Sequence, residues 1–440
     1  MYRVPSLFRR LEQAGTFKMS LFAAIMGFLT YSSMYAFRKP FAAAVFEGEL
    51  LWGLDLKIWL ILAQTLGYMA SKFYGIKVIS ELKKEGRAWL IIGLISISWV
   101  ALLGFAVVQE PYSIVFFLIN GFPLGLIWGI VFHYMEGRQF TEMMGSMLAA
   151  SFVFSSGFVK SVGVYLMQNW QISEHWMPFV TGGVFFPLLV LSVFLLNHIP
   201  EPTDQDLQLR SPRAPMTKKA RKDFFKEFRP GIILLIIVYM MLTGLRDLRD
   251  NFVVEIWDGL NISVEPELLT QTEIPITLGL LVLMTALVLV KNNKKAFFIN
   301  HWIILIGFGL SIFSTLGLQA GFISPFFWMV MVGAGVYMAY IPFNCLLFDR
   351  LIATFKRSGN VGFLMYLVDS FGYLGSSLIL FSKQLGGWDS IPWLQFYITA
   401  IFGFLGLSLI LMAASFIYFQ RKLLREKRAK PHSVTLVNSL

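Results

Sequence analysis

Twelve segments of predominantly apolar residues divide the chain, and each is long enough to cross about 30 Å of hydrocarbon as a helix. Because backbone polar groups in lipid must be satisfied within the segment, such runs predict membrane-spanning helices. The segments lie at about 18–37, 57–79, 88–108, 113–135, 143–167, 177–198, 231–250, 274–291, 297–318, 325–348, 360–382 and 394–419. The pattern therefore predicts an all-α membrane protein with twelve transmembrane helices.

One long polar stretch, residues 200–230, separates the first six segments from the last six. It contains several prolines and a basic run, LRSPRAPMTKKARKDFFKEFRP, which is typical of a solvated connection between two folded units. We therefore predict a six-helix bundle over residues 1–199, a cytoplasmic linker over 200–230, a second six-helix bundle over 231–420 and a basic cytoplasmic tail over 421–440.

Composition agrees with a membrane protein, because only 14% of the residues are charged and 56% are hydrophobic, whereas a soluble domain has about 25% charged residues. The net charge of +11 is concentrated in the loops of one face. That is the positive-inside distribution, which places both termini in the cytoplasm and the protein in the cell (inner or plasma) membrane. It indicates membrane orientation and a lipid bilayer as partner, with no role for nucleic acid.

Cofactor chemistry has no support in the sequence. The single cysteine, Cys345, excludes an intramolecular disulfide framework, and the chain shows no metal-ligand spacing or redox motif. No nucleophile–base pair or phosphate-binding loop is evident. We therefore expect a protein that is not an enzyme, has no cofactor or metal and is monomeric.

The two halves of the chain repeat. A shift of 211 residues lays the end of the seventh segment, LRDLRDNFVVEIWDG, on the end of the first, MYAFRKPFAAAVFEG. Further matches at an offset of 212 agree with it. The matched pairs are Arg38 with Arg249, Phe41 with Phe252, Gly48 with Gly259, Thr65-Leu66-Gly67 with Thr277-Leu278-Gly279, Gly121 with Gly333, and Arg138 with Arg350. Such agreement predicts parallel repeats related by an axis along the membrane normal.

Several charged residues fall inside the apolar segments, where each costs on the order of 3 kcal/mol unless a partner, a cavity or a ligand offsets the cost. The candidates are Arg38, Lys72, Lys160, Arg246, Arg249 and Asp369. Cations outnumber the one clearly intramembrane acid, which predicts a positive cavity that selects an anion. Arginine favours an anion with forked oxygen acceptors, such as a phosphate ester, and then a carboxylate.

Each of these residues also has a simpler interpretation. Lys72 and Lys160 could extend toward a membrane interface. Arg246 could pair with Asp250 one turn later, and Asp369 could serve only as a counter-ion rather than in proton coupling. Tyr31 and Tyr35 are placed with Arg38 by their spacing of four and seven residues on one helical face.

At these residues the chain resembles the major facilitator superfamily and, within it, the organophosphate:phosphate antiporters that carry glycerol phosphate and hexose phosphates. The resemblance lies in short motifs of both halves. They are Tyr31 and Tyr35 followed by Arg38-Lys39-Pro40-Phe41, Ser71-Lys72-Phe73 in the second helix, Phe371-Gly372-Tyr373-Leu374-Gly375 in the eleventh, and Gly387-Trp388-Asp389 after it. The resemblance implies the major facilitator fold and a phosphate-binding site between the two bundles.

Carried over to this chain, the resemblance implies that Arg38 and one arginine of the seventh helix hold the phosphate, with Lys72 and the tyrosines beside them. Which arginine is meant depends on the alignment: the repeat selects Arg249, whereas the seven-residue spacing from Tyr239 selects Arg246. We prefer Arg249. Where the family has a substrate-site histidine in the fifth helix, this chain has Ser155 and Ser156, with Lys160 a turn later.

The sequence thus predicts a secondary active transporter that moves an organic phosphate or related organic anion by alternating access, in exchange for phosphate. Two other functions remain open. One is a membrane sensor or receptor that retains the carrier fold and signals through a partner. The other is a nucleotide exchanger, because Leu-Arg-Asp-Leu-Arg-Asp-Asn-Phe at residues 245–252 resembles the start of the ATP/ADP antiporters of plastids and intracellular bacteria.

Overall fold

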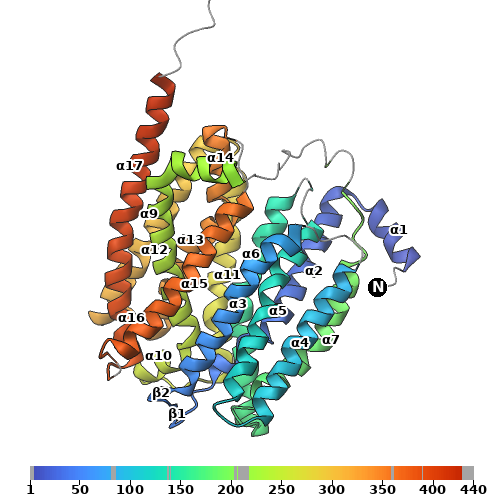
Figure 1. Cartoon of the computed structure of the whole chain (residues 1–440), viewed down its shortest axis with the longest axis vertical. Coiled ribbons are helices and arrows are strands. Elements are labelled where there is room, and N and C mark those ends of the chain that lie inside the picture. Colours follow the sequence, from blue (N-terminus) through green and yellow to red (C-terminus); the bar gives the residue numbers. More distant parts are fainter. Residues whose placement is uncertain are drawn as a thin grey trace, which may run out of the picture.

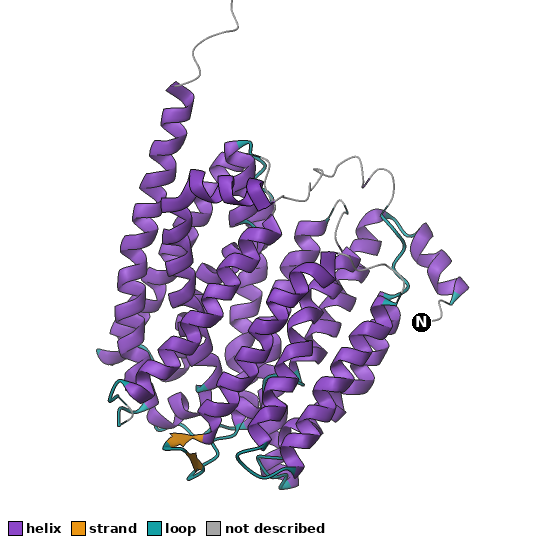
Figure 2. Cartoon of the chain, in the orientation of Figure 1, coloured by secondary structure: helices purple, strands orange, loops and turns teal. Residues whose placement is uncertain are grey.

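The structure is a computed structural model that describes residues 4–80, 86–135, 138, 140–202, 206, 218–357, 361–388 and 390–428. Within these residues the fold is helical apart from one short hairpin (Figure 2). Its strands, β1 (Leu50–Leu51) and β2 (Leu54–Asp55), pair antiparallel, with Leu50 opposite Asp55. The predicted all-α class is confirmed.

Six long helices precede the linker and six follow it. The first half contains α1 (Pro5–Gln13), α2 (Thr16–Tyr35), the 3-10 turn η1 (Pro40–Ala43), α3 (Leu56–Ser80), α4 (Arg87–Val107), α5 (Ser113–Met135), α6 (Thr141–Trp170) and α7 (Met177–Leu196). The second half contains α9 (Lys218–Asn251), α10 (Val253–Gly259), α11 (Pro266–Val288), α12 (Asn293–Gln319), α13 (Pro325–Cys345), α14 (Leu347–Phe355) and α15 (Val361–Leu385). It ends with α16 (Trp393–Ala400), the π-helical segment η2 (Ile401–Leu405) and α17 (Gly406–Arg428), which together make one long helix.

Ten helices among the described residues are long and apolar enough to cross a membrane. The other two long helices, α2 and α3, have 20 and 25 residues and lie among these ten. They are less apolar because α2 carries serines and tyrosines and α3 carries Lys57, Gln64 and Lys72. Many large apolar side chains point outward, as lipid-facing helices require. Examples are Val100, Val282, Phe313 and Ile410.

The helix packing has two-fold pseudosymmetry. In the first half α3 and α4 pack on α5, and α2 packs on α6 and α7. The same pairs recur in the second half, where α11 and α12 pack on α13, and α9 packs on α15 and α17. Between the halves α6 packs on α11 and α3 packs on α15, which are also equivalent pairs. The two bundles lie side by side, α2–α7 in blue to green and α9–α17 in yellow-green to red (Figure 1).

Two faces of the molecule are used below. The linker face is the one where α7 ends and α9 begins, and the hairpin face is the opposite one, which carries β1, β2 and α10 (Figure 1). Because α9 runs from the linker face to the hairpin face, its last residues, including Asp250, lie near the hairpin face.

Two predicted boundaries need correction. The seventh helix begins at Lys218 rather than at 231, and the last helix continues to Arg428, inside the predicted tail. Hydropathy detects only the part of a helix that fits lipid, whereas α9 extends beyond it as an amphipathic helix. There Phe228 packs on Phe355 and Phe419, with ring centroids 5.0 and 6.4 Å away. Of the predicted linker, residues 203–205 and 207–217 lie outside the described residues, as does the tail beyond Arg428.

Candidate functional site

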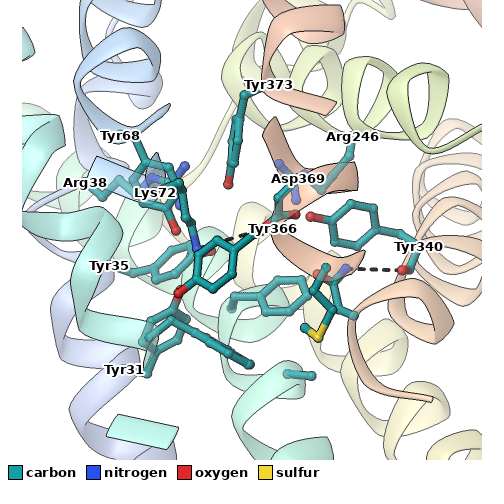
Figure 3. Close-up of a pocket in the computed structure, with 15 residues that line it drawn as sticks. Tyr31, Tyr35, Arg38, Tyr68, Lys72, Arg246, Tyr340, Tyr366, Asp369 and Tyr373 are labelled. Atoms are coloured by element: carbon teal, nitrogen blue, oxygen red, sulfur yellow. Dashed lines mark hydrogen bonds and ion pairs between the residues drawn. The ribbon is translucent and has the colours of Figure 1, made fainter. Parts of the chain in front are cut away.

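A cavity lies between the two bundles and contains roughly 750 Å³ of space, part of it continuous with solvent. From the first bundle it is lined by Tyr31, Tyr35, Arg38, Tyr68, Lys72, Trp128, Ala149 and Phe152. From the second it is lined by Arg246, Tyr340, Asn344, Met365, Tyr366, Asp369 and Tyr373. Figure 3 shows the labelled side chains of α2 and α3 facing those of α9, α13 and α15. Both bundles therefore contribute charged groups to one space.

Arg38 is positioned by a turn and not by a helix. The helix α2 ends at Tyr35, and the backbone N–H groups of Arg38 and Lys39 both donate to the Tyr35 carbonyl at 3.0 Å. The Gln64 amide donates to the Arg38 carbonyl, also at 3.0 Å. The Asn120 amide likewise donates to the Phe37 carbonyl at 3.0 Å. Buried amides of α3 and α5 thus fix the turn from which the Arg38 side chain extends.

The guanidinium of Arg38 lies against aromatic rings. Its central carbon is 4.0 Å from the centroid of Tyr68 and 5.8 Å from that of Tyr35. Among the described residues no carboxylate lies within ion-pair distance of it, and its Nε is buried without a hydrogen-bond partner. Buried polar groups are rarely left unpaired, so Arg38 is an unusual buried cation that has no acidic partner among the described residues.

Lys72 and Asp369 connect the bundles on the wall of the cavity. Lys72 Nζ lies 3.7 Å from Asp369 Oδ2 and 5.1 Å from the Tyr68 ring centroid. The Tyr239 hydroxyl donates to Asp369 Oδ1 at 2.5 Å and is also hydrogen-bonded to the Tyr340 hydroxyl at 2.8 Å. Asp369 is therefore held by Tyr239 while it partly neutralises Lys72.

Of the two candidate arginines in α9, Arg246 lines the cavity and Arg249 does not. Arg246 lies 4.4 Å from the Tyr340 ring centroid, and its Nη2 donates to Asp247 Oδ1 at 2.7 Å. It does not form the pair with Asp250 that the sequence allowed. The Arg249 side chain is 3% exposed, and its Nη1 donates to Glu273 Oε1 at 2.7 Å.

The preference for Arg249 in the cavity is thus not supported by the geometry. The repeat alignment equated Arg249 with Arg38, but Arg38 follows the end of α2 whereas α9 remains helical to Asn251. Equal sequence positions in a turn and in a helix do not place side chains in equal directions. The alternative spacing, seven residues from Tyr239, selects the arginine that lines the cavity.

Lys160 also lies outside the cavity lining. Its Nζ is 2.7 Å from Asp250 Oδ1, and Lys39 pairs with the other oxygen of that carboxylate. Lys57 pairs with Glu255, and the Thr270 hydroxyl donates to the Ser161 hydroxyl at 2.7 Å. All these contacts join the first bundle to the second near the hairpin face, and they close that side of the cavity.

Four tyrosines of the cavity were not among the residues predicted from the sequence: Tyr68, Tyr340, Tyr366 and Tyr373. In α15, Tyr366, Asp369 and Tyr373 have helical spacing of three and seven residues, which places them on one face. That spacing could have been used to predict Tyr366 and Tyr373 as cavity residues. No such pattern marks Tyr68, because a tyrosine in an apolar segment is more often packed or at an interface.

This arrangement of two pseudosymmetric six-helix bundles around a polar cavity defines a multi-pass integral membrane protein of the major facilitator fold. Solved structures with this fold are similar over nearly the whole chain. The D-xylose–proton symporter has a TM-score of 0.58 and 12% identity, covering 91% of this chain and 96% of its own. The nucleoside transporter NupG has a TM-score of 0.58 and 14% identity, covering 91% and 99%.

A bacterial homologue of the human drug peptide transporters PepT1 and PepT2 has a TM-score of 0.59 and 13% identity, covering 92% of this chain and 99% of its own. The chain itself belongs to a family of unknown function, DUF5690, whose model matches residues 40–422. A comparison with curated proteins found no match. At such low identities the likeness to solved structures shows the fold alone.

Proposed function

We propose that this protein is a secondary active transporter that moves an organic phosphate or related organic anion by alternating access, in exchange for phosphate. The transporters that share its fold support a transport role. The choice of an anion rests on the cavity, and the choice of phosphate on its arginines and on the resemblance to the organophosphate:phosphate antiporters.

The observation that carries the proposal is the unpaired guanidinium of Arg38. Among the described residues, the other cations near the centre of the molecule have acidic partners: Lys72 has Asp369, Arg246 has Asp247, and Arg249 has Glu273. Among the described cations that line the cavity, Arg38 is therefore the one without an acidic partner. An anion that accepts two parallel hydrogen bonds satisfies such a group best.

The aromatic lining suits the organic part of such an anion. Six tyrosines, Trp128 and Phe152 line the cavity. Tyrosine presents an apolar ring face and a hydroxyl that both donates and accepts, so the same wall can contact carbon atoms and hydroxyl groups. Inorganic phosphate alone would leave this surface unused, which favours an ester as the transported substrate.

The unequal closure of the two faces supports alternating access. Near the hairpin face the bundles are joined by Lys160 and Asp250 and by Lys57 and Glu255. On the other side the cavity lining includes Asn344 and Met365, near the linker-face ends of α13 and α15. Transport requires these hairpin-face contacts to break while the linker face closes.

The test is a thermal-shift screen of the purified protein against inorganic phosphate, glycerol 3-phosphate, glucose 6-phosphate, ATP and dicarboxylates, because a specific ligand stabilises the native state by mass action. The best ligand is then tested for counterflow in proteoliposomes. We expect a phosphate ester to stabilise the protein and to exchange with phosphate. Stabilisation without counterflow would indicate a receptor, and stabilisation by ATP alone would indicate a nucleotide exchanger.

A further inference from the structure

Three loops of the first bundle meet on the hairpin face and bring together two carboxylates and an imidazole. Glu49 lies between α2 and α3, Glu110 between α4 and α5, and His175 between α6 and α7. His175 Nε2 is 3.4 Å from Glu49 Oε2 and 3.2 Å from Glu110 Oε1. The three ligand atoms all lie within 4.8 Å of one another. None of these residues lines the cavity.

The distances allow metal ligation as well as hydrogen bonding, since His175 Nε2 is also within hydrogen-bond reach of Glu110 Oε1 at 3.2 Å. A charge-assisted N–H···O bond is usually about 2.7–2.9 Å long, and the single N–H of one ring nitrogen cannot serve two carboxylates well. Zinc binds nitrogen and oxygen ligands at about 2.0–2.2 Å in a tetrahedron, which places neighbouring ligand atoms roughly 3.4 Å apart. Both contacts of His175 are close to that separation.

The ligands are also held in place by contacts that do not involve one another. The His175 ring stacks on Phe105, with centroids 5.2 Å apart and an interplanar angle of 15°. The Phe46 ring lies nearly perpendicular to it, with centroids 5.5 Å apart. The neighbouring Glu174 carboxylate accepts hydrogen bonds from the backbone N–H groups of Val45 and Phe46, at 3.0 and 2.7 Å. These contacts join the loop of His175 to the loop of Glu49 and direct Nε2 toward the carboxylates.

We propose that Glu49, Glu110 and His175 bind a divalent transition-metal ion, with zinc as the best fit, and that a water molecule completes the coordination. Imidazole and carboxylate ligands suit zinc, and three protein ligands plus water is a common arrangement for it. The ion would join three loops of one bundle outside the substrate cavity, so its role would be to stabilise the hairpin face. The inference is independent of the proposed transport function.

The test is calorimetric titration of zinc chloride into the metal-stripped, full-length protein, purified without a polyhistidine tag at neutral pH. We expect about one zinc per chain and a zinc-dependent rise in the melting temperature. His175→Asn and Glu110→Gln should each weaken binding by at least about tenfold. Glu110→Gln is nearly isosteric, so it keeps the test valid if His175→Asn does not fold.

The matched control is Glu267→Gln, which makes the same change at an exposed acid outside the cluster, in the first turn of α11. It should bind zinc like the wild type. Absence of saturable zinc binding by the wild-type protein would overturn the proposal. Undiminished binding by both His175→Asn and Glu110→Gln would also overturn it.

Discussion

Lys160 of α6 and Asp250 of α9 form an ion pair across the two bundles, with Nζ 2.7 Å from Oδ1. Lys39 pairs with the same carboxylate, and the Ser156 hydroxyl donates to it. One acid from the second bundle therefore pairs with two lysines of the first. All four residues are at most about a tenth exposed, so solvent screens these charges weakly.

Replacing this acid should open the hairpin face. Asp250→Asn leaves two buried lysines without a counter-ion, which costs about 3–5 kcal/mol in the closed arrangement. We expect the variant to expose Ala43, which is only 4% exposed in this structure. The measurement is maleimide labelling of Ala43→Cys in a Cys345→Ser background, where the rate should rise at least about tenfold. Asp258→Asn, at an exposed acid of α10, is the control; equal labelling of both variants would show that Asp250 does not hold this face closed.

The matched glycines Gly67 and Gly279 should differ in how much an alanine substitution changes the stability of the protein. A methyl group at Gly67 would lie 2.2 Å from the carbonyl oxygen of Leu118, because α3 and α5 pack backbone to backbone there. Nothing lies within 4 Å of the same position at Gly279, its match in the second half. Gly67→Ala should destabilise the protein by about 1–3 kcal/mol. Gly279→Ala should be neutral or slightly stabilising, and thermal unfolding in detergent compares the two; equal melting temperatures would contradict the packing.

Arg249 should matter for stability and not for binding. Glu273→Gln removes its buried partner and should cost about 3–5 kcal/mol of unfolding free energy while ligand affinity stays unchanged. The control on the same helix is the exposed Glu267→Gln, which should change stability by less than about 1 kcal/mol. A stable Glu273→Gln protein that no longer binds the anion would show that Arg249 contributes to anion binding.

Asp369 should limit anion affinity. Among the described residues that line the cavity it is the one acid, and it lies 3.7 Å from Lys72. Asp369→Asn keeps the shape of the side chain but removes the negative charge that pairs with Lys72. The anion should therefore bind about three- to tenfold more tightly at low salt. Equilibrium binding at two salt concentrations measures this, with Lys72→Gln expected to weaken binding. Weaker binding by Asp369→Asn would instead indicate that its carboxylate contacts the ligand.

The sequence predicted the features that depend on lipid and on repetition. Hydropathy predicted the spans because a bilayer requires apolar helices of a set length, and the excess of buried cations predicted a positive cavity. The sequence could not show which of Arg246 and Arg249 lines the cavity, because that depends on where α2 stops being helical. Nor could it predict the cluster at His175, since Glu110 and His175 are 65 residues apart and meet only when the loops fold together.

The most direct test of the central claim, that Arg38 binds the anion, is phosphate counterflow in proteoliposomes by the wild type and three arginine-to-lysine variants. Lysine keeps the charge but loses the forked donors, which should lower anion affinity by about 10- to 100-fold. We predict that Arg38→Lys and Arg246→Lys lose most of the exchange and that Arg249→Lys, reconstituted to the same level, retains it. Near-normal exchange by Arg38→Lys would contradict the account.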